Sequence, residues 1–143
     1  MTISRRTVRE AVAAGIVTAT ASLDPAPVVY DYFRTGFDGE SPVVRVWSNA
    51  AQRPDSAVQC ISSTFSLTVQ VWVLIDENGT AAQQAESEDI LDAIETAIAT
   101  WVMANTQTAN WNGLRYERPS MIQTLQINAF IYAVESIALQ VQA

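Results

Sequence analysis

The feature that most constrains the fold is an alternating stretch from Phe65 to Ile75, which leads through Asp76-Glu77-Asn78-Gly79 into an amphipathic segment at 80–104. The early even positions of the stretch are polar, whereas its odd positions are all apolar: Phe65, Leu67, Val69, Val71, Val73 and Ile75. Alternation with a period of two predicts a strand with one buried face. We expect the segment that follows to supply the helix that covers this face.

That segment has the pattern of a capped helix. Thr80 and Gln83 fit a capping box, in which their side chains satisfy the free N–H groups of the first turn. An apolar stripe then recurs at helical spacing, and its members are Ile90, Leu91, Ile94, Ala97, Ile98, Trp101 and Val102. The sequence therefore predicts a long helix that packs on the strand.

The remaining elements are shorter. A helix is expected from about residue 4 to 20, with Ser4 as its N-cap and a face of Val8, Ala11, Val12, Gly15, Ile16 and Ala19. Strands are expected at 28–33, at 43–47 as a returning strand, at 114–118, and at 122–141 with a bend near Glu135. Polar loops separate them at 34–42 and 48–63, the second centred on Pro54-Asp55.

This order predicts one α+β domain over residues 1–143, with its sheet and helix core at about 28–141. The sheet should be antiparallel or mixed, with two main helices packed on it. Ser4-Arg5-Arg6-Thr7-Val8 and the apolar residues after it also imitate a twin-arginine export signal. Glu10 interrupts that pattern, so the amphipathic helix is the favoured interpretation. No run approaches the roughly 20 apolar residues of a membrane span.

Composition argues against most catalytic machinery. The chain has no histidine, and all eight basic residues are arginine. Triads that use histidine, the usual zinc sites, Schiff bases and the P-loop lysine are therefore excluded. The single cysteine, Cys60, is interpreted as a structural or incidental thiol and not as a reactive one, since no histidine can activate it. We predict no catalytic residue, no cofactor and no metal site.

Carboxylates leave one alternative open. Glu88, Asp92 and Glu95 recur along one side of the predicted helix, with Glu86 and Asp89 nearby. Such oxygens can hold Mg²⁺ or Ca²⁺ or supply an acid–base pair. A solvated acidic face is favoured, because acidic side chains suit the first turns of a helix.

The net charge of −7 makes a general nucleic-acid-binding surface unlikely, since phosphate affinity comes from clustered basic residues. An acidic wall can still surround DNA without gripping it. Tyr30 and Tyr32 share one face of their predicted strand and Phe33 takes the other, which indicates a strand covered on both faces by the fold or by another subunit.

Three segments carry a resemblance to a known family: "VVYDYFRTGFDGESPVVRVWS", then "FSLTVQVWVLIDENGTAAQQAESEDILDAIETAIATWV", and finally "LRYERPSMIQTLQINAFIYAVE". Together they resemble the tail-terminator proteins of long-tailed, lambdoid siphophage-like bacteriophages. The resemblance covers chiefly Val28 to Glu135. It rests on the order and length of elements and includes no catalytic signature.

The resemblance implies a non-enzymatic virion protein of the tail–neck region, made in the host cytoplasm. Such proteins form a ring, expected to be hexameric, which ends growth of the tail tube at its head-proximal end. The implied partners are other copies of the chain, the tail tube protein and the head–tail connector or head-closure protein. Genomic DNA is expected to pass through the channel of the ring without sequence-specific binding. No membrane is involved.

On this hypothesis, Tyr30, Tyr32, Arg34 and Arg45 are predicted to contribute to subunit contacts, and Glu86, Glu88 and Asp92 to face the channel. Three alternatives remain: another neck subunit, such as a tail-completion or head-closure protein; a carboxylate-based enzyme or metal-binding soluble domain; and an exported soluble domain with a mature chain that starts near Ser22.

Overall fold

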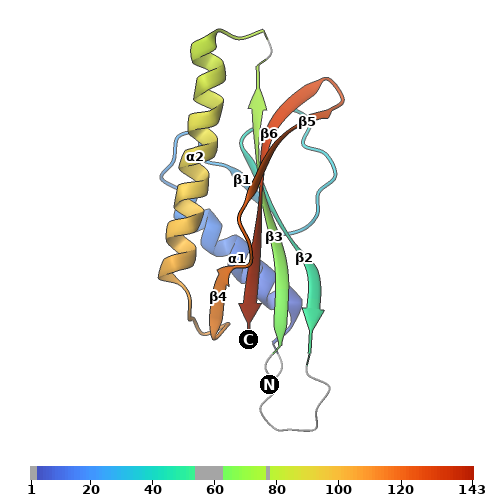
Figure 1. Cartoon of the computed structure of the whole chain (residues 1–143), viewed down its shortest axis with the longest axis vertical. Helices are drawn as coiled ribbons and strands as arrows, with labels where there is room; N and C mark the ends of the chain where they lie inside the picture. Colours follow the sequence, from blue (N-terminus) through green and yellow to red (C-terminus); the bar gives the residue numbers. More distant parts are fainter. Residues whose placement is uncertain (1–2, 54–62, 77) are drawn as a thin grey trace.

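The computed structural model describes residues 3–53, 63–76 and 78–143. These residues form two helices, α1 (Arg5–Thr20) and α2 (Ala81–Ala104), and six strands. The strands are β1 (Val28–Tyr30), β2 (Val43–Gln52), β3 (Thr64–Ile75), β4 (Gly113–Tyr116), β5 (Met121–Ile127) and β6 (Phe130–Gln142). The expected α+β class is confirmed, with all six strands in a mixed sheet (Figure 1).

The sheet is built around β3, as the alternating stretch predicts. Its strand order is β1-β2-β3-β6-β4, and β5 pairs with β6 beyond the part that β4 covers. β3 runs antiparallel to both β2 and β6, and its register with β6 extends from Thr64↔Gln142 to Ile75↔Ile131. Long antiparallel pairing on both sides fixes which face of β3 carries the apolar side chains.

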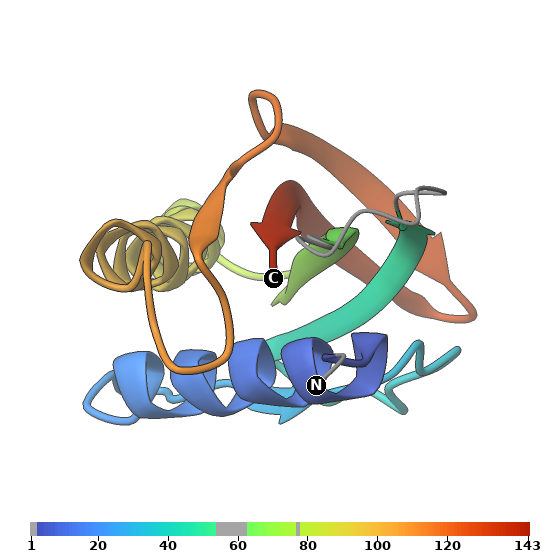
Figure 2. The ribbon, with the colours of Figure 1, turned by 90° about the horizontal axis from the view of Figure 1, so that it is seen from below.

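The main core lies between the sheet and the two helices. The odd side chains of β3 from Phe65 to Val73 are buried there, as predicted. Both helices pack on this face of the sheet and against each other, α2 beside β3 and β6 and α1 across β2 (Figures 1 and 2). The buried helical side chains of this core are Val8, Val12, Ala13, Ile16, Leu91, Ile94, Ile98 and Val102.

Local signals place both helices as the sequence predicts. Ser4 caps α1 by accepting a hydrogen bond from the backbone N–H of Thr7. The capping box of α2 is confirmed, because Thr80 and Gln83 satisfy each other's backbone N–H groups. Where the helices meet, Gly15 of α1 lies so close to the ring of Trp101 that a Cβ there would overlap it. The close approach of α1 to α2 therefore depends on this glycine.

A second cluster covers part of the opposite sheet face. Phe37, Val43, Trp72, Tyr132 and Val134 are all buried in it. The even side chains near the end of β3 are apolar because they lie in this cluster.

The prediction of a returning strand at 43–47 is wrong in direction. β1 pairs parallel with β2, from Val28↔Val43 to Tyr30↔Arg45. Parallel neighbours need a crossover of about a dozen residues or more. Residues 31–42 supply it by passing over the second cluster, where Phe37 is buried. β1 also ends at Tyr30, short of the predicted Phe33.

The predicted polar loop at 48–63 begins later than expected. β2 continues to Gln52 and pairs with β3 as far as Gln52↔Thr64, after an irregularity between Ser48 and Ala50. The last residues of β2 were predicted as a loop because they are exposed and polar or small, so they lack the apolar pattern of a buried strand. The predictions for Pro54-Asp55 and Cys60 lie outside the described residues.

The predicted single strand at 122–141 is a hairpin. It breaks at Asn128-Ala129 and not near Glu135, and Ile127 pairs with Phe130 across that two-residue turn. Asn128 has a φ of 55°, in the left-handed region that asparagine tolerates in tight hairpin turns. Alternation continues through the turn, which hides it from a periodicity analysis.

In the part of the chain that the structure describes, neither helix is long and apolar enough to cross a membrane.

Candidate interaction surfaces

The loop at 31–42 is held to the sheet by its aromatic anchor. The ring of Phe37 makes edge-to-face contacts with Trp72, at 5.0 Å between centroids, and with Tyr132, at 6.2 Å. These geometries are the ones that aromatic pairs favour. An apolar residue between Gly36 and Gly39 is the sequence signal for this anchor.

Arg45 lies beneath this loop and is almost completely buried, with 8% of its surface exposed. Its guanidinium donates to Gln70 Oε1 at 2.9 and 2.7 Å and to the carbonyl of Arg34. Aromatic rings surround it, with the guanidinium carbon 4.1 Å from the centroid of Phe33 and 4.9 Å from that of Trp47. Burial lowers the pKa of Arg45. Cation–π contacts and neutral hydrogen-bond acceptors thus surround the charge.

Tyr30 and Arg34 organise the outer side of the loop around Glu40. The Tyr30 hydroxyl donates to the two carboxylate oxygens of Glu40 at 2.8 and 2.9 Å. Arg34 Nη2 lies 3.6 Å from Glu40 Oε1, and its guanidinium carbon sits 4.6 Å from the Tyr30 ring centroid. The hydrogen bond to Glu40 raises the pKa of Tyr30.

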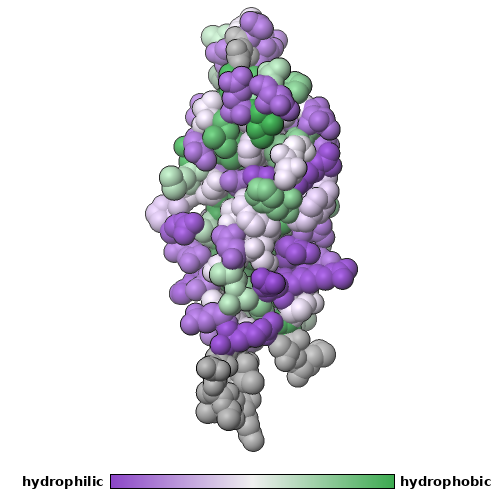
Figure 3. Space-filling view, turned by 90° about the vertical axis from the view of Figure 1, so that its right-hand side faces the viewer, coloured by the Kyte–Doolittle hydropathy of each residue, from purple (hydrophilic) through white to green (hydrophobic). Residues whose placement is uncertain are grey.

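The structure brings the four predicted interface residues together in one region. Tyr32 stands at the surface with 48% exposure and makes an edge contact with Tyr30 at 5.7 Å, while Arg45 lies below and holds the loop. Phe33, which was not among the predicted contacts, is 52% exposed. The face of the molecule that lies on the right in Figure 1 carries both hydrophobic and hydrophilic side chains (Figure 3). We call Tyr32, Phe33 and Arg34 the aromatic loop surface.

The three acidic residues predicted to face a channel are exposed, but they lie on two flanks of α2. Glu86 lines a hollow together with Asp89 and Leu23. Glu88 lines a different groove beside β5. Asp92 lies one turn after Glu88 and acts electrostatically on Glu135 of β6. Among the described residues, no three acidic or thiol side chains gather closely enough to hold a metal ion.

Glu135 is a buried carboxyl that the sequence analysis noted only as a bend. It is 3% exposed and accepts a hydrogen bond from the Ser120 hydroxyl at 2.7 Å. Burial raises its pKa, Glu95 and Asp92 add to the rise, and the Ser120 hydrogen bond opposes it. The sequence signal for this buried carboxyl was a single charged residue within an apolar alternating strand.

Tyr116 also has a raised pKa. Burial and the charges of Glu95 and Glu135 raise the pKa of Tyr116 to about 12.

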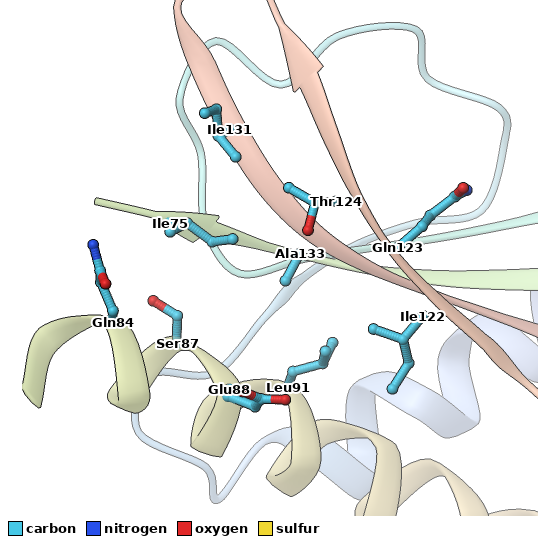
Figure 4. A pocket seen from close by; sticks show the side chains of 10 residues that line it. All are labelled: Ile75, Gln84, Ser87, Glu88, Leu91, Ile122, Gln123, Thr124, Ile131 and Ala133. Carbon is cyan, nitrogen blue, oxygen red and sulfur yellow. The ribbon is translucent and has the colours of Figure 1, made fainter. Parts of the chain in front are cut away.

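A groove beside β5 has a volume of about 640 Å³. Its apolar lining comes from Ile75, Leu91, Ile122, Ile131 and Ala133. Gln84, Ser87 and Glu88 of α2 form one wall, and β5 forms the other, with Ile122 and Thr124 across from the helix (Figure 4). Such an apolar groove with a few polar groups suits a ligand or a peptide segment.

No protein-family model matches the chain, and no curated protein matches it. Among solved structures, a chain from the virion of a native gene transfer agent (GTA) particle is similar with a TM-score of 0.42 and 12% identity. The match covers 97% of this chain and 92% of that one. A likeness of this strength establishes neither a shared fold nor a shared role.

Proposed function

We propose that this protein is a structural virion subunit that caps the head-proximal end of a phage tail tube as a ring. The ring, expected to be hexameric, ends tube growth and forms the interface to the head connector. Its partners are other copies of the chain, the tail tube protein and the connector, and DNA slides through its channel. The protein performs no catalysis in this role.

The observation that carries this proposal is the placement of two unlike surfaces on opposite sides of one sheet. The 31–42 crossover, which carries the aromatic loop surface, lies over one face of the sheet, and α2, which carries the carboxylates, lies on the other (Figures 1 and 2). A closed ring is built by head-to-tail contacts between two different patches of each subunit. Tyr32 and Phe33 supply the aromatic contact area that subunit interfaces favour.

Two further features support the same role. The strand–turn–helix unit, one of the features on which the resemblance rests, is present as β3 and α2. The net charge of −7 suits a channel wall that DNA must pass without binding.

The test is electron microscopy of particles from a phage that lacks this gene, with complementation by the intact gene as control. Overlong or ragged tubes with unattached heads are expected, because nothing then stops tube growth. Tails of normal length that fail to join heads would instead identify a head-closure or tail-completion subunit and would contradict the terminator role.

A further inference from the structure

Strand β5 has an edge without the usual protection against pairing with another chain. Within the described residues it pairs only with β6, in an uninterrupted register from Met121↔Ser136 to Ile127↔Phe130. Residues 121–127 contain no charged residue, proline or glycine. Met121 and Ile122 are 68% and 60% exposed. Uncharged, uninterrupted edges of this kind can template the addition of another strand.

Two other edges of the same sheet, on β2 and β4, are protected. β2 is irregular between Ser48 and Ala50 where it extends past β1. β4 carries the exposed Arg115 and is followed by Glu117-Arg118-Pro119. Bulges, charges and proline are the devices that prevent edge pairing. The contrast indicates that the β5 edge is open because something covers it in use.

The open edge borders the groove beside α2. The pair that closes a two-residue hairpin turn is hydrogen-bonded, so the alternate residues Gln126, Thr124 and Ile122 direct backbone N–H and C=O groups outward. The side chains of Ile122 and Thr124 line the groove (Figure 4), whereas Leu125 and Ile127 pack on the opposite face. A strand added at this edge would therefore place alternate side chains in the groove.

Charge identifies what the added strand carries. Glu88 lines the groove, and Asp92 and Glu95 follow it on the same helix. The charges of Asp92 and Glu95 reach Glu135, which pairs with Ile122 of β5. Neither α2, β5 nor β6 contains a basic residue. Pairing of β5 with β5 of a second copy would bring two acidic helices together, which like-charge repulsion disfavours. The complement is a segment with basic side chains.

We propose that the open edge of β5 binds an extended segment of a partner protein, which adds as a further strand and presents apolar and basic side chains to the groove. Backbone hydrogen bonds along the edge supply affinity, and the groove and Glu88 supply selectivity. This inference is independent of the tail role and concerns the free protein.

The probe is a labelled peptide, acetyl-Val-Thr-Arg-Thr-Val-Thr-Arg-Thr-amide, measured by fluorescence anisotropy with the full chain at low and high salt. Its control replaces both arginines with glutamate, which leaves the valine and threonine residues of the peptide unchanged. We expect saturable binding of the arginine peptide and at least about tenfold weaker binding of the glutamate peptide. Equal binding of the two, or no binding of either, would overturn the proposal.

Two variants and one control locate the site. Thr124→Pro removes an outward N–H and should abolish binding, whereas Thr124→Val keeps that N–H and should bind normally; thermal unfolding checks that both fold. Glu88→Arg should reverse the preference between the peptides without altering the edge. Wild-type affinity in both Thr124→Pro and Glu88→Arg would overturn the inference. So would sedimentation showing a dimer that Thr124→Pro dissociates, since a second copy would then be the occupant.

Discussion

At the scale of single residues, Arg45 shows how a buried cation can organise a surface loop. Its guanidinium bonds to Gln70 and to the carbonyl of Arg34, and it stacks beneath Phe33. The hydrocarbon part of the side chain fills space among aromatic rings, so truncation loses packing as well as hydrogen bonds.

We therefore predict that Arg45→Ala lowers the free energy of unfolding by about 2–4 kcal/mol. Arg115→Ala is the matched control, because Arg115 also bonds to a glutamine but is exposed. The control should stay within about 0.5 kcal/mol of wild type. Urea unfolding followed by tryptophan fluorescence measures both, and equal losses would contradict the anchoring role of Arg45.

Glu135 makes a pH-dependent contribution to stability. Burial raises its folded-state pKa above the ordinary value of 4.5, so the folded chain holds this proton more tightly than the unfolded chain. Stability from this group is present below the ordinary pKa and is lost as pH rises through the raised pKa.

Glu135→Gln, whose amide oxygen still accepts from Ser120, should therefore be stabilising at neutral pH, and its advantage over wild type should shrink as pH falls toward 4.5. Chemical unfolding at a series of pH values gives the difference between the two proteins. Glu117→Gln, at an exposed position, should track wild type throughout. A difference for Glu135→Gln that does not change with pH would refute this assignment.

At the scale of elements, the crossing of α1 and α2 depends on Gly15. Alanine usually stabilises a helix interior relative to glycine by about 1 kcal/mol. Here the added Cβ would overlap the Trp101 ring, so Gly15→Ala should instead destabilise the protein by about 1–3 kcal/mol.

The exposed neighbour provides the control, since Ala14→Gly should cost only the propensity term of about 1 kcal/mol. Thermal melts of Gly15→Ala, Trp101→Phe and their combination test the contact directly. The smaller ring should relieve part of the clash, so the combined loss should fall below the sum of the two. Strict additivity would mean that the two residues do not share this contact.

How far the elements follow from sequence depends on how local their determinants are. β3 and α2 were predicted almost to the residue, because alternation and the Thr80–Gln83 cap are local signals. The β1–β2 direction was wrong because it depends on the burial of Phe37 across the sheet. The hairpin at Asn128 was missed because it preserves alternation on both sides. The predicted interface residues Tyr30, Tyr32 and Arg34 do cluster, but the burial of Arg45 arises from tertiary packing that no spacing reveals.

At the scale of the whole molecule, the acidic charge is distributed over both flanks of α2, with Glu86 on one and Glu88 on the other. A ring subunit has one channel-facing side, so the proposed function requires that one flank faces DNA and the other meets protein. The open edge of β5 borders the Glu88 flank, which leaves the Glu86 flank as the side available to a channel.

Charge reversal separates the two flanks. If the Glu86 flank lines the channel, Glu86→Arg should give tails of normal length with slowed DNA ejection, because an arginine there would bind phosphate groups. High salt should restore the ejection rate, since it weakens this electrostatic binding. Glu88→Arg should leave ejection unchanged while altering partner binding. Glu117→Arg, at an exposed position between β4 and β5, controls for added positive charge. Ejection kinetics of purified particles at several salt concentrations measure the effect, and slowing by Glu88→Arg but not by Glu86→Arg would reverse the orientation of the subunit in the ring.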